Sequence, residues 1–406
     1  MSRKRLTGWR AVWLGLFATP ALLVATVLLL GVTAGSAGPS TSAVTVAAAQ
    51  ATSGVTTQAT ALGSGQQTLQ ELMAYWTPER MADATPKVLT PTTAPERAEG
   101  SMQSAPSGGT IHFARMQADG SVSESSYTVE GGDVQPLHEP YHGDIPFTRW
   151  QYFAKYLPNT VGGGTNVAVS AQAKMFFTQG ASNFVCSAST IGQDAVWTAA
   201  HCLSNGAGAF STNVLFCPSY DNGVNAQSGC WGADSLTVSS VFHSTGDGDY
   251  DIGGANASNT GTIRNQTIGS FTGWLGIAYV ATTGSELFNA NWISFGYPQA
   301  APFNGLKIHV CASSLGYQDA WTPGNVESKS IGCDMTGGSS GGPWILNMVR
   351  PAQIGGTPPP GLPNTVFGHN GWRHTAETRE LNSPSYNCLA IVVYRIINNL
   401  APVACP

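Results

Sequence analysis

The C-terminal part of the chain, residues 165–406, predicts an all-β fold that ends in one helix. Short stretches rich in β-branched and aromatic residues recur along it, and Gly, Pro, Asn and Ser separate them. Only residues 388–400 have a helical pattern. Many short strands with one terminal helix are typical of a closed barrel or a sandwich. About 240 residues suffice for one compact domain of this kind.

The expected strands are short, and most of them end near a residue that favours turns. They cover residues 166–178, 184–191, 195–198, 214–216, 236–242, 274–280, 291–295, 306–311 and 344–348.

The composition of the 406 residues is typical of an exported β-rich protein. Only 10% of the residues are charged, whereas about a quarter is usual. The formal net charge is −5, so the chain lacks the basic excess of a nucleic-acid-binding protein. We therefore expect no nucleic-acid partner.

The first 37 residues predict an export signal. Four Lys and Arg residues lie in the first ten positions, and an apolar run follows at 11–34. The run is long enough to serve as a membrane anchor. Pro20 interrupts it, however, and small residues suited to cleavage follow at 35–37. We expect a cleaved signal peptide and secretion, with a retained membrane anchor as the alternative.

Residues 38–160 predict a propeptide with linkers, of which 38–70 are too polar and simple in composition to fold. This region lacks cysteine and differs in composition from residues 165–406. We expect it to assist folding or to block an active site; the alternative is a surface tether.

Three local elements are expected inside this leader. Residues 68–76 have a helical pattern, and Thr77 is a candidate N-cap for a second helix that starts at Pro78. Residues 85–108 form a Pro/Thr/Ser linker, and residues 110–130 predict a β-hairpin around Asp119-Gly120.

Eight cysteines, an even number, all lie at or after position 186. In an exported chain this indicates disulfides. The spacings suggest, without proving, pairing in sequence order: Cys186 with Cys202, Cys217 with Cys230, Cys311 with Cys333, and Cys388 with Cys405. No C-x2-C pair is present, so the pattern disfavours zinc and we expect no metal.

The first chemical motif is the turn Gly337-Gly338-Ser339-Ser340-Gly341-Gly342-Pro343. Such a turn can hold one hydroxyl among exposed backbone N–H groups, which is the geometry that acyl transfer requires. Ser340 is the candidate nucleophile. Alone, the stretch is equally consistent with a flexible Gly/Ser linker.

The second motif is Val196-Trp197-Thr198-Ala199-Ala200-His201-Cys202. Small residues after an apolar strand let the backbone turn and present the His201 imidazole. A disulfide from Cys202 to Cys186 would stabilise that turn by about 3 kcal/mol in the entropy model.

The third motif is Asp247-Gly248-Asp249-Tyr250-Asp251-Ile252-Gly253. A catalytic histidine needs a carboxylate that fixes its tautomer. Asp251 is the better candidate because apolar Ile252 follows it. The alternating aspartates suggest a calcium loop as well, but Ile252 and Ser258 occupy the places of the glycine and glutamate that an EF-hand requires.

These three motifs, in this order, resemble the His, Asp and Ser motifs of the chymotrypsin/trypsin-like serine peptidases. His201 and Asp251 are 50 residues apart, and Asp251 and Ser340 are 89 apart. The segments 174–177, 184–187, 295–298 and 75–81 further resemble the secreted bacterial trypsin-like and glutamyl-endopeptidase-like group. The resemblance implies a double six-stranded β-barrel, with His201 and Asp251 from the first barrel and Ser340 from the second.

The resemblance also implies the reaction, which is hydrolysis of peptide bonds through an acyl-enzyme. Ser340 would attack the scissile carbonyl, His201 would transfer the proton, and Asp251 would orient His201. The amides of Gly338 and Ser340 would form the oxyanion hole. The expectation is a secreted serine endopeptidase made as a zymogen. It would act on proteins or peptides as a monomer without a cofactor, with its own propeptide as a partner.

Two departures from the family pattern leave activation and specificity open. Animal trypsins carry an aspartate before the nucleophile, and Ser339 stands there, so the trypsin-like start at Val161-Gly162-Gly163 is not thereby a cleavage site. Asp334 lies at the offset of the trypsin specificity acid, but Cys333 precedes it, and Asp334 would serve equally as a turn cap. His369 lies in a segment that resembles the glutamyl-endopeptidase strand, so basic and acidic preferences both stay open.

Two rival functions are weaker. Residues 338–342 also satisfy the G-x-S-x-G elbow of α/β-hydrolase esterases, which need an acid and then a histidine after the serine. No aspartate follows Ser340, and the only later glutamates, Glu377 and Glu380, come after the last histidine, His374. A catalytically inactive protease fold that serves as a binding module is the other alternative.

Overall fold

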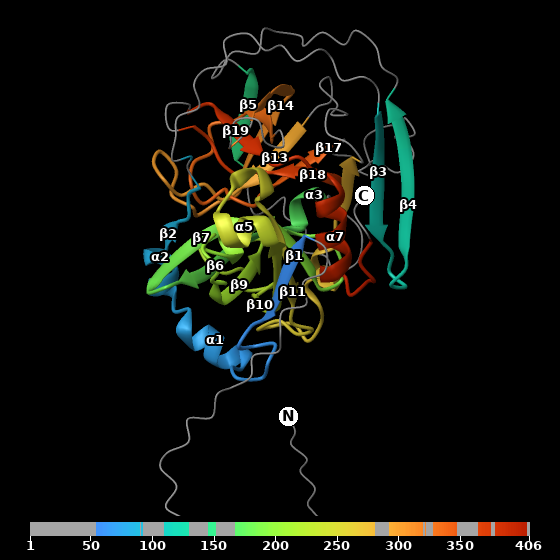
Figure 1. Cartoon of the computed structure of the whole chain (residues 1–406). Coiled ribbons are helices and arrows are strands. Elements are labelled where there is room, and N and C mark those ends of the chain that lie inside the picture. The colour runs from blue at the N-terminus through green and yellow to red at the C-terminus, as the bar shows by residue number, and fades with distance from the viewer. Residues whose placement is uncertain are drawn as a thin grey trace, which may run out of the picture. The chain divides into compact units, whose positions relative to one another are not determined.

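One sheet of the protein closes on itself into a six-stranded antiparallel barrel (Figure 1). Its order is β10-β11-β8-β7-β6-β9, and β9 pairs back onto β10. The strands are β6 (Gln172–Gln179), β7 (Ser182–Thr190), β8 (Ala195–Ala199), β9 (Thr212–Pro218), β10 (Trp231–Ser239) and β11 (Ile252–Ala257). This barrel confirms the first half of the expected architecture.

The structure is a computed structural model. It describes residues 54–89, 91, 109–129, 145–151, 167–280, 292–319, 321, 328–346, 364–374 and 378–403. The predicted export signal, the Val161-Gly162-Gly163 segment and Cys405 lie outside the described residues. Within them, no helix has both the length and the apolar character needed to cross a membrane.

The second sheet differs from the expected second barrel. Its order is β4-β3-β12-β18-β17-β13-β14-β5, and β12 pairs with β18 in parallel. The strands are β3 (Gly109–Met116), β4 (Val122–Val129), β5 (Phe147–Gln151), β12 (Gly276–Val280), β13 (Trp292–Gly296), β14 (His309–Ser313), β17 (Pro343–Leu346) and β18 (Thr365–His369). A separate sheet holds β15 (Leu315–Asp319), β16 (Ser328–Gly332) and β19 (Glu380–Ser383).

The prediction of two closed six-stranded barrels is therefore correct for one barrel only. Among the described residues the second sheet is open and mixed. The physical reason is that leader strands occupy its edges: β3 pairs with β12, and β5 pairs with β14. Strands that already have a neighbour on each side cannot pair with each other to close a barrel.

The leader is more ordered than expected of a partly disordered propeptide. Helix α1 (Leu69–Tyr75) begins with a capping box of Thr68 and Glu71, and α2 (Pro78–Asp83) begins at the predicted Thr77 cap. Strand β1 (Val55–Ala59) pairs with β10, and β2 (Thr85–Pro86) pairs with β7 in parallel. The leader thus extends both sheets, and the boundary near residue 160 stays a prediction.

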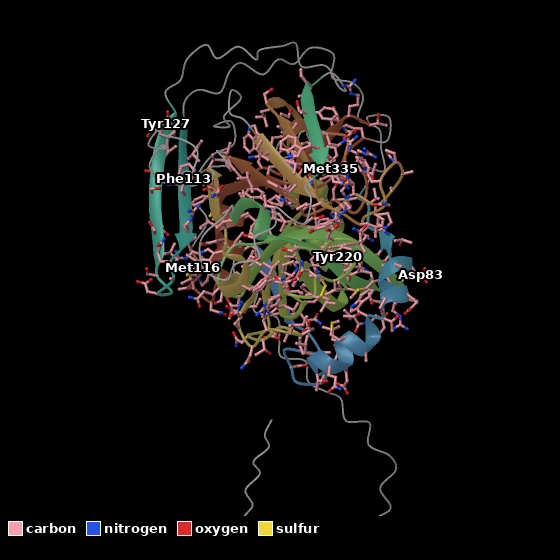
Figure 2. All side chains as sticks on the ribbon, turned by 180° about the vertical axis from the view of Figure 1, so that it is seen from behind. Asp83, Phe113, Met116, Tyr127, Tyr220 and Met335 are labelled. Carbon is pink, nitrogen blue, oxygen red and sulfur yellow. A yellow bond between two sulfur atoms is a disulfide. The ribbon has the colours of Figure 1, made fainter. Side chains whose placement is uncertain are left out.

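The predicted hairpin is confirmed as β3 and β4, which pair along their whole length. Phe113 and Met116 of β3 are buried, whereas Tyr127 of β4 is 49% exposed. Figure 2 labels these side chains on the hairpin. The sheet therefore uses β3 as an internal strand and leaves β4 as its edge.

The terminal helix is confirmed as α7 (Cys388–Ile397), which packs against β8, β10, β11 and β12. Short helical segments lie between strands at α3 (Val167–Ser170), α4 (Ala200–Leu203), α5 (Ser240–Thr245), η2 (Gly248–Tyr250) and α6 (Ile268–Thr272). The expected strand 236–242 is wrong after Ser239, because the Ser239 side chain caps α5 and ends the strand.

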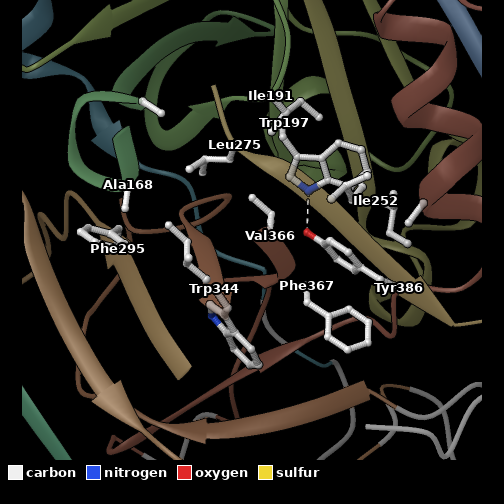
Figure 3. Close-up of a cluster of buried hydrophobic side chains, with 14 of the residues drawn as sticks. Ala168, Ile191, Trp197, Ile252, Leu275, Phe295, Trp344, Val366, Phe367 and Tyr386 are labelled. Atoms are coloured by element: carbon white, nitrogen blue, oxygen red, sulfur yellow. Dashed lines mark hydrogen bonds between the residues drawn. The ribbon is translucent and has the colours of Figure 1, made fainter. Parts of the chain in front are cut away.

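Three of the predicted disulfides are confirmed: Cys186–Cys202, Cys217–Cys230 and Cys311–Cys333. Cys388 is also disulfide-bonded, and its predicted partner Cys405 is not among the described residues. Buried apolar side chains from both sheets form one cluster (Figure 3). Trp197 of the barrel and Trp344 of the second sheet belong to this one core.

Candidate active site

The turn at His201 is built by the barrel. Strand β11 pairs antiparallel with β8, so that Ile252 lies opposite Ala199. The residue before β11, Asp251, therefore lies next to α4, which follows β8 and contains His201. The backbone N–H of Ala200 donates to the carbonyl of Asp251 at 3.3 Å. The pairing of β8 with β11 thus brings two residues 50 positions apart into contact.

Asp251 and His201 form two hydrogen bonds. The His201 backbone N–H donates to Asp251 Oδ1 at 2.7 Å, and His201 Nδ1 lies 2.8 Å from Asp251 Oδ2. An ionised carboxylate only accepts, so Nδ1 carries the proton. Both side chains are buried, with relative exposures of 1% and 0%. Burial opposes ionisation of Asp251, but the charge and hydrogen bond of His201, with a smaller contribution from nearby His369, outweigh it and lower the pKa of Asp251.

The turn with Ser340 is fixed by glycines and by contacts to the barrel. Gly341 has φ = +79°, and a Cβ there would lie 2.0 Å from Thr198 Oγ1, so only glycine fits. Ser187 N–H donates to the carbonyl of Ser340 at 2.7 Å, and the Ser187 hydroxyl donates to the carbonyl of Gly338 at 2.9 Å. Ser187 therefore ties the Ser340 turn to strand β7.

The Cys186–Cys202 disulfide joins the two parts of the site. Its sulfurs and a ring nitrogen of His201 lie within 4.8 Å of one another, and Cys202 Sγ lies 4.0 Å from the carbonyl oxygen of Ser340. Because both sulfurs are in the disulfide, neither can serve as the thiolate ligand of a metal. The disulfide therefore lies next to both the predicted histidine and the predicted serine.

The structure does not join Ser340 to His201 by a hydrogen bond. Ser340 Oγ donates to the carbonyl oxygen of Lys87 at 3.3 Å. His201 Nε2 is buried and has no hydrogen-bond partner among the described residues. Sequence reasoning missed Lys87, because nothing in a Pro/Thr-rich linker marks it.

Lys87 belongs to a segment that we name the strap, residues 84–88. Its N–H donates to the carbonyl of Val185 at 3.1 Å, which extends the parallel pairing of β2 with β7. The carbonyl of Ala84 accepts a hydrogen bond from Gln299 Nε2 at 2.6 Å. A Cβ on Gly337 would lie 2.6 Å from Val88 Cγ2, so the strap also packs on the Ser340 turn.

Asp334, a predicted substrate-binding residue, is engaged by the leader. Arg149 Nε lies 2.7 Å from Asp334 Oδ1, and both side chains are about one-third exposed. Arg149 belongs to β5 and lies opposite Cys311 of β14. Sequence reasoning missed this arginine, because β5 has no pattern that would place it beside a residue almost 200 positions away.

His369, the other predicted substrate-binding residue, lies inside the protein at 0% exposure. Its Nε2 is 4.0 Å from Asp251 Oδ2, and its Nδ1 is 2.8 Å from the Tyr386 hydroxyl. His369 thus lies behind the carboxylate of Asp251, and its role in binding a substrate side chain stays a prediction.

The two aspartates before Asp251 have structural partners. Asp247 caps η2 through the N–H of Asp249. Asp249 is buried, and its Oδ1 accepts hydrogen bonds from the Trp321 N–H at 2.7 Å and the Ser328 hydroxyl at 2.9 Å. The pattern that suggested calcium is thus accounted for by bonds within the protein.

Three solved protease structures are similar to this chain. The chain is 29% identical to the thermostable serine protease AL20 from an extremophilic microorganism and 30% identical to the protease Anisep from Arthrobacter nicotinovorans. Each match covers 58% of this chain and 100% or 99% of the other, with TM-scores of 0.48. A Glu endopeptidase solved in complex with MPD is 16% identical over 62% of this chain and 96% of its own, with a TM-score of 0.44.

No protein-family model and no curated protein matches the chain. The family is shown by the 30% identity over almost the whole of Anisep, and not by superpositions with TM-scores below 0.5. The chain belongs to the chymotrypsin-like serine proteases, which confirms the resemblance. Disulfides together with this membership indicate an extracellular protein.

Proposed function

We propose that the protein is a secreted serine endopeptidase that hydrolyses peptide bonds with Ser340, His201 and Asp251. The single observation that carries the proposal is the buried pair of His201 and Asp251, joined by bonds of 2.7 and 2.8 Å and packed through a disulfide to the Ser340 turn. Membership in the protease family supports it.

Each residue has one role in this reaction. Asp251 holds the proton on Nδ1 of His201, so Nε2 is the nitrogen that can accept the proton of Ser340. Ser340 then attacks the carbonyl carbon, and Nε2 returns the proton to the leaving amine. The backbone N–H groups of Gly338 and Ser340 stabilise the oxyanion, and the loss of one such donor typically costs about 3–4 kcal/mol.

The chain with its strap in place is proposed to be a latent precursor. The Ser340 hydroxyl donates to Lys87, so it is not available to His201. Ser339 is buried, and its hydroxyl donates to the Thr336 carbonyl at 2.9 Å. Ser339 therefore already has a partner inside the protein and does not need the new N-terminal amine that the aspartate of animal trypsins binds. Activation then requires release of the strap, and the leader is the propeptide of a zymogen. The active form is secreted and monomeric.

Substrate preference depends on the surface that the leader covers. Asp334 is neutralised by Arg149 of β5 while the leader is bound. Release of the leader would remove Arg149 and expose the Asp334 carboxylate, which favours basic substrate side chains. Profiling cleavage of a peptide library, after mapping of the mature N-terminus, decides between a basic and an acidic preference.

A fluorophosphonate probe tests the reaction itself. The secreted and processed protein is expected to be labelled on Ser340 and to cleave peptides, and the variant Ser340→Ala is expected to do neither. If the processed wild-type protein takes up no probe and cleaves no peptide, the chain is an inactive protease fold that serves as a binding module.

The strap is tested in the unprocessed chain. Lys87→Pro removes the N–H that donates to Val185, a bond worth about 1 kcal/mol. Faster labelling of Ser340, by roughly fivefold, is expected. The matched control is Asp83→Ala, an exposed neighbour of the strap. Equal labelling rates in both variants would refute the latent precursor.

A further inference from the structure

A buried histidine that the proposed reaction does not use lies behind Asp251. His369 ends strand β18, opposite Pro343, which follows the Ser340 turn. It is fully buried, and its Nε2 has no hydrogen-bond partner among the described residues. An imidazole in such a place needs an explanation, because burial of an unpaired polar group is costly.

The protonation of His369 is set by a chain of hydrogen bonds. The indole N–H of Trp197 can only donate, and its nitrogen lies 2.5 Å from the Tyr386 hydroxyl oxygen (Figure 3). That oxygen accepts from Trp197, so the single Tyr386 proton is free to point to His369 Nδ1 at 2.8 Å. Nδ1 is then the acceptor, and the ring proton of His369 is on Nε2.

The charge state of these groups agrees with that assignment. Burial raises the pKa of Tyr386 well above its usual value, so the hydroxyl keeps its proton. Burial also lowers the pKa of His369, although Asp251 opposes this shift, so the ring is neutral. The titratable groups that act on His369 are Asp251 and His201, with Tyr386 bonded to its other nitrogen.

The Nε2–H of His369 is therefore directed at the carboxylate of Asp251. Asp251 Oδ2 lies 2.8 Å from His201 Nδ1 and 4.0 Å from His369 Nε2. At 4.0 Å the second contact is electrostatic and not a formed hydrogen bond. In a buried site such a dipole acts more strongly than it would in water.

We propose that His369 is a positioning residue for Asp251, with its Nε2–H set by Trp197 and Tyr386. The neutral ring favours an ionised Asp251 and leaves the positive charge to His201 when His201 takes the proton of Ser340. This inference rests on the proposed peptidase function. It assigns His369 to the reaction from inside the protein and not to the binding of a substrate side chain.

The test compares His369→Leu with His369→Gln in the secreted enzyme, among samples that share one mapped N-terminus. Glutamine offers an acceptor for Tyr386 and an N–H for Asp251, and leucine offers neither. We expect leucine to lower kcat roughly 10-fold to 100-fold with KM within about twofold, and glutamine to restore most of kcat. Active-site titration with a fluorophosphonate normalises the enzyme concentration.

Tyr386→Phe keeps the test decisive if the leucine variant does not fold. Phenylalanine preserves the ring and removes the hydroxyl that fixes the tautomer of His369, so kcat is expected to fall with KM unchanged. His243→Gln, a partly buried histidine that bonds to Ser204, is the matched control and is expected to keep kcat.

The outcomes separate the two proposals. A wild-type enzyme that takes up no probe refutes the peptidase function. An active wild type whose leucine and phenylalanine variants keep kcat overturns the role of His369 alone. A folded glutamine variant that is no better than leucine also overturns it, because packing would then explain the loss.

Discussion

The histidine part of the candidate site is held by a closed barrel, whereas the serine part lies on a turn that the leader covers. His201 and Asp251 are almost fully buried and already joined. Ser340 is 7% exposed, and its hydroxyl is bonded to the strap. The difference suggests that His201 and Asp251 already have their final arrangement in this chain, whereas the Ser340 hydroxyl is kept apart from them.

The largest expected effect on kcat comes from a substitution in the histidine part of the site. Asp251→Asn should lower kcat about 10⁴-fold, because an amide favours the wrong tautomer of His201. Steady-state kinetics on a peptide substrate measure it. Asp221→Asn, which removes a partly exposed ion pair with Lys307, should change kcat less than about twofold. A loss of less than tenfold in Asp251→Asn would contradict the assigned role.

The next largest effect is expected at the serine part of the site, when the leader is held less firmly. Trp76 anchors the leader: its ring is 1% exposed and its Nε1–H donates to the carbonyl of Asn213 at 2.7 Å. Trp76→Ala should weaken leader binding by about 3–5 kcal/mol. The unprocessed variant should therefore label Ser340 faster than the wild type. The fluorophosphonate rate reports this, and a rate unchanged from the wild type would show that the leader does not control Ser340.

Two disulfides offer a matched comparison. The pairs Cys186–Cys202 and Cys217–Cys230 span 16 and 13 residues, so removing either by double alanine substitution should cost about 3 kcal/mol of folding free energy. Only the first contacts His201 and Ser340. Thermal unfolding should show similar losses for both variants, and kcat should fall only without Cys186–Cys202. Equal kcat values in the two variants would show that Cys186–Cys202 has no role in the active site.

The smallest effect concerns acid stability. The pKa of Asp251 is lowered in the folded protein. The ionised carboxylate therefore adds to the free energy of unfolding. This contribution is complete above the pKa of the unfolded chain, about 3.9, and is lost as the pH falls through the pKa of the folded protein. Urea unfolding below pH 4 should show a smaller acid loss in Asp251→Asn than in wild type. Asp83→Asn, which is exposed, should follow the wild type. Parallel curves for all three proteins would exclude this contribution.

The sequence by itself determined the all-β class, the terminal helix, the leader helices and hairpin, and three disulfides. These elements depend on local patterns: caps, turn residues, strand propensity and cysteine spacing, which act over a few residues. The motifs also pointed to His201, Asp251 and Ser340, because the residue types that acyl transfer requires stand in recognisable turns.

Only the tertiary structure decided what lies beside those turns. The bond from Ser340 to Lys87, the pairing of Asp334 with Arg149 and the place of His369 behind Asp251 join segments that are far apart in the chain. The opening of the second sheet has the same origin, because β3 and β5 of the leader pair with its strands. Such contacts depend on register and packing between distant strands, and no local pattern encodes them.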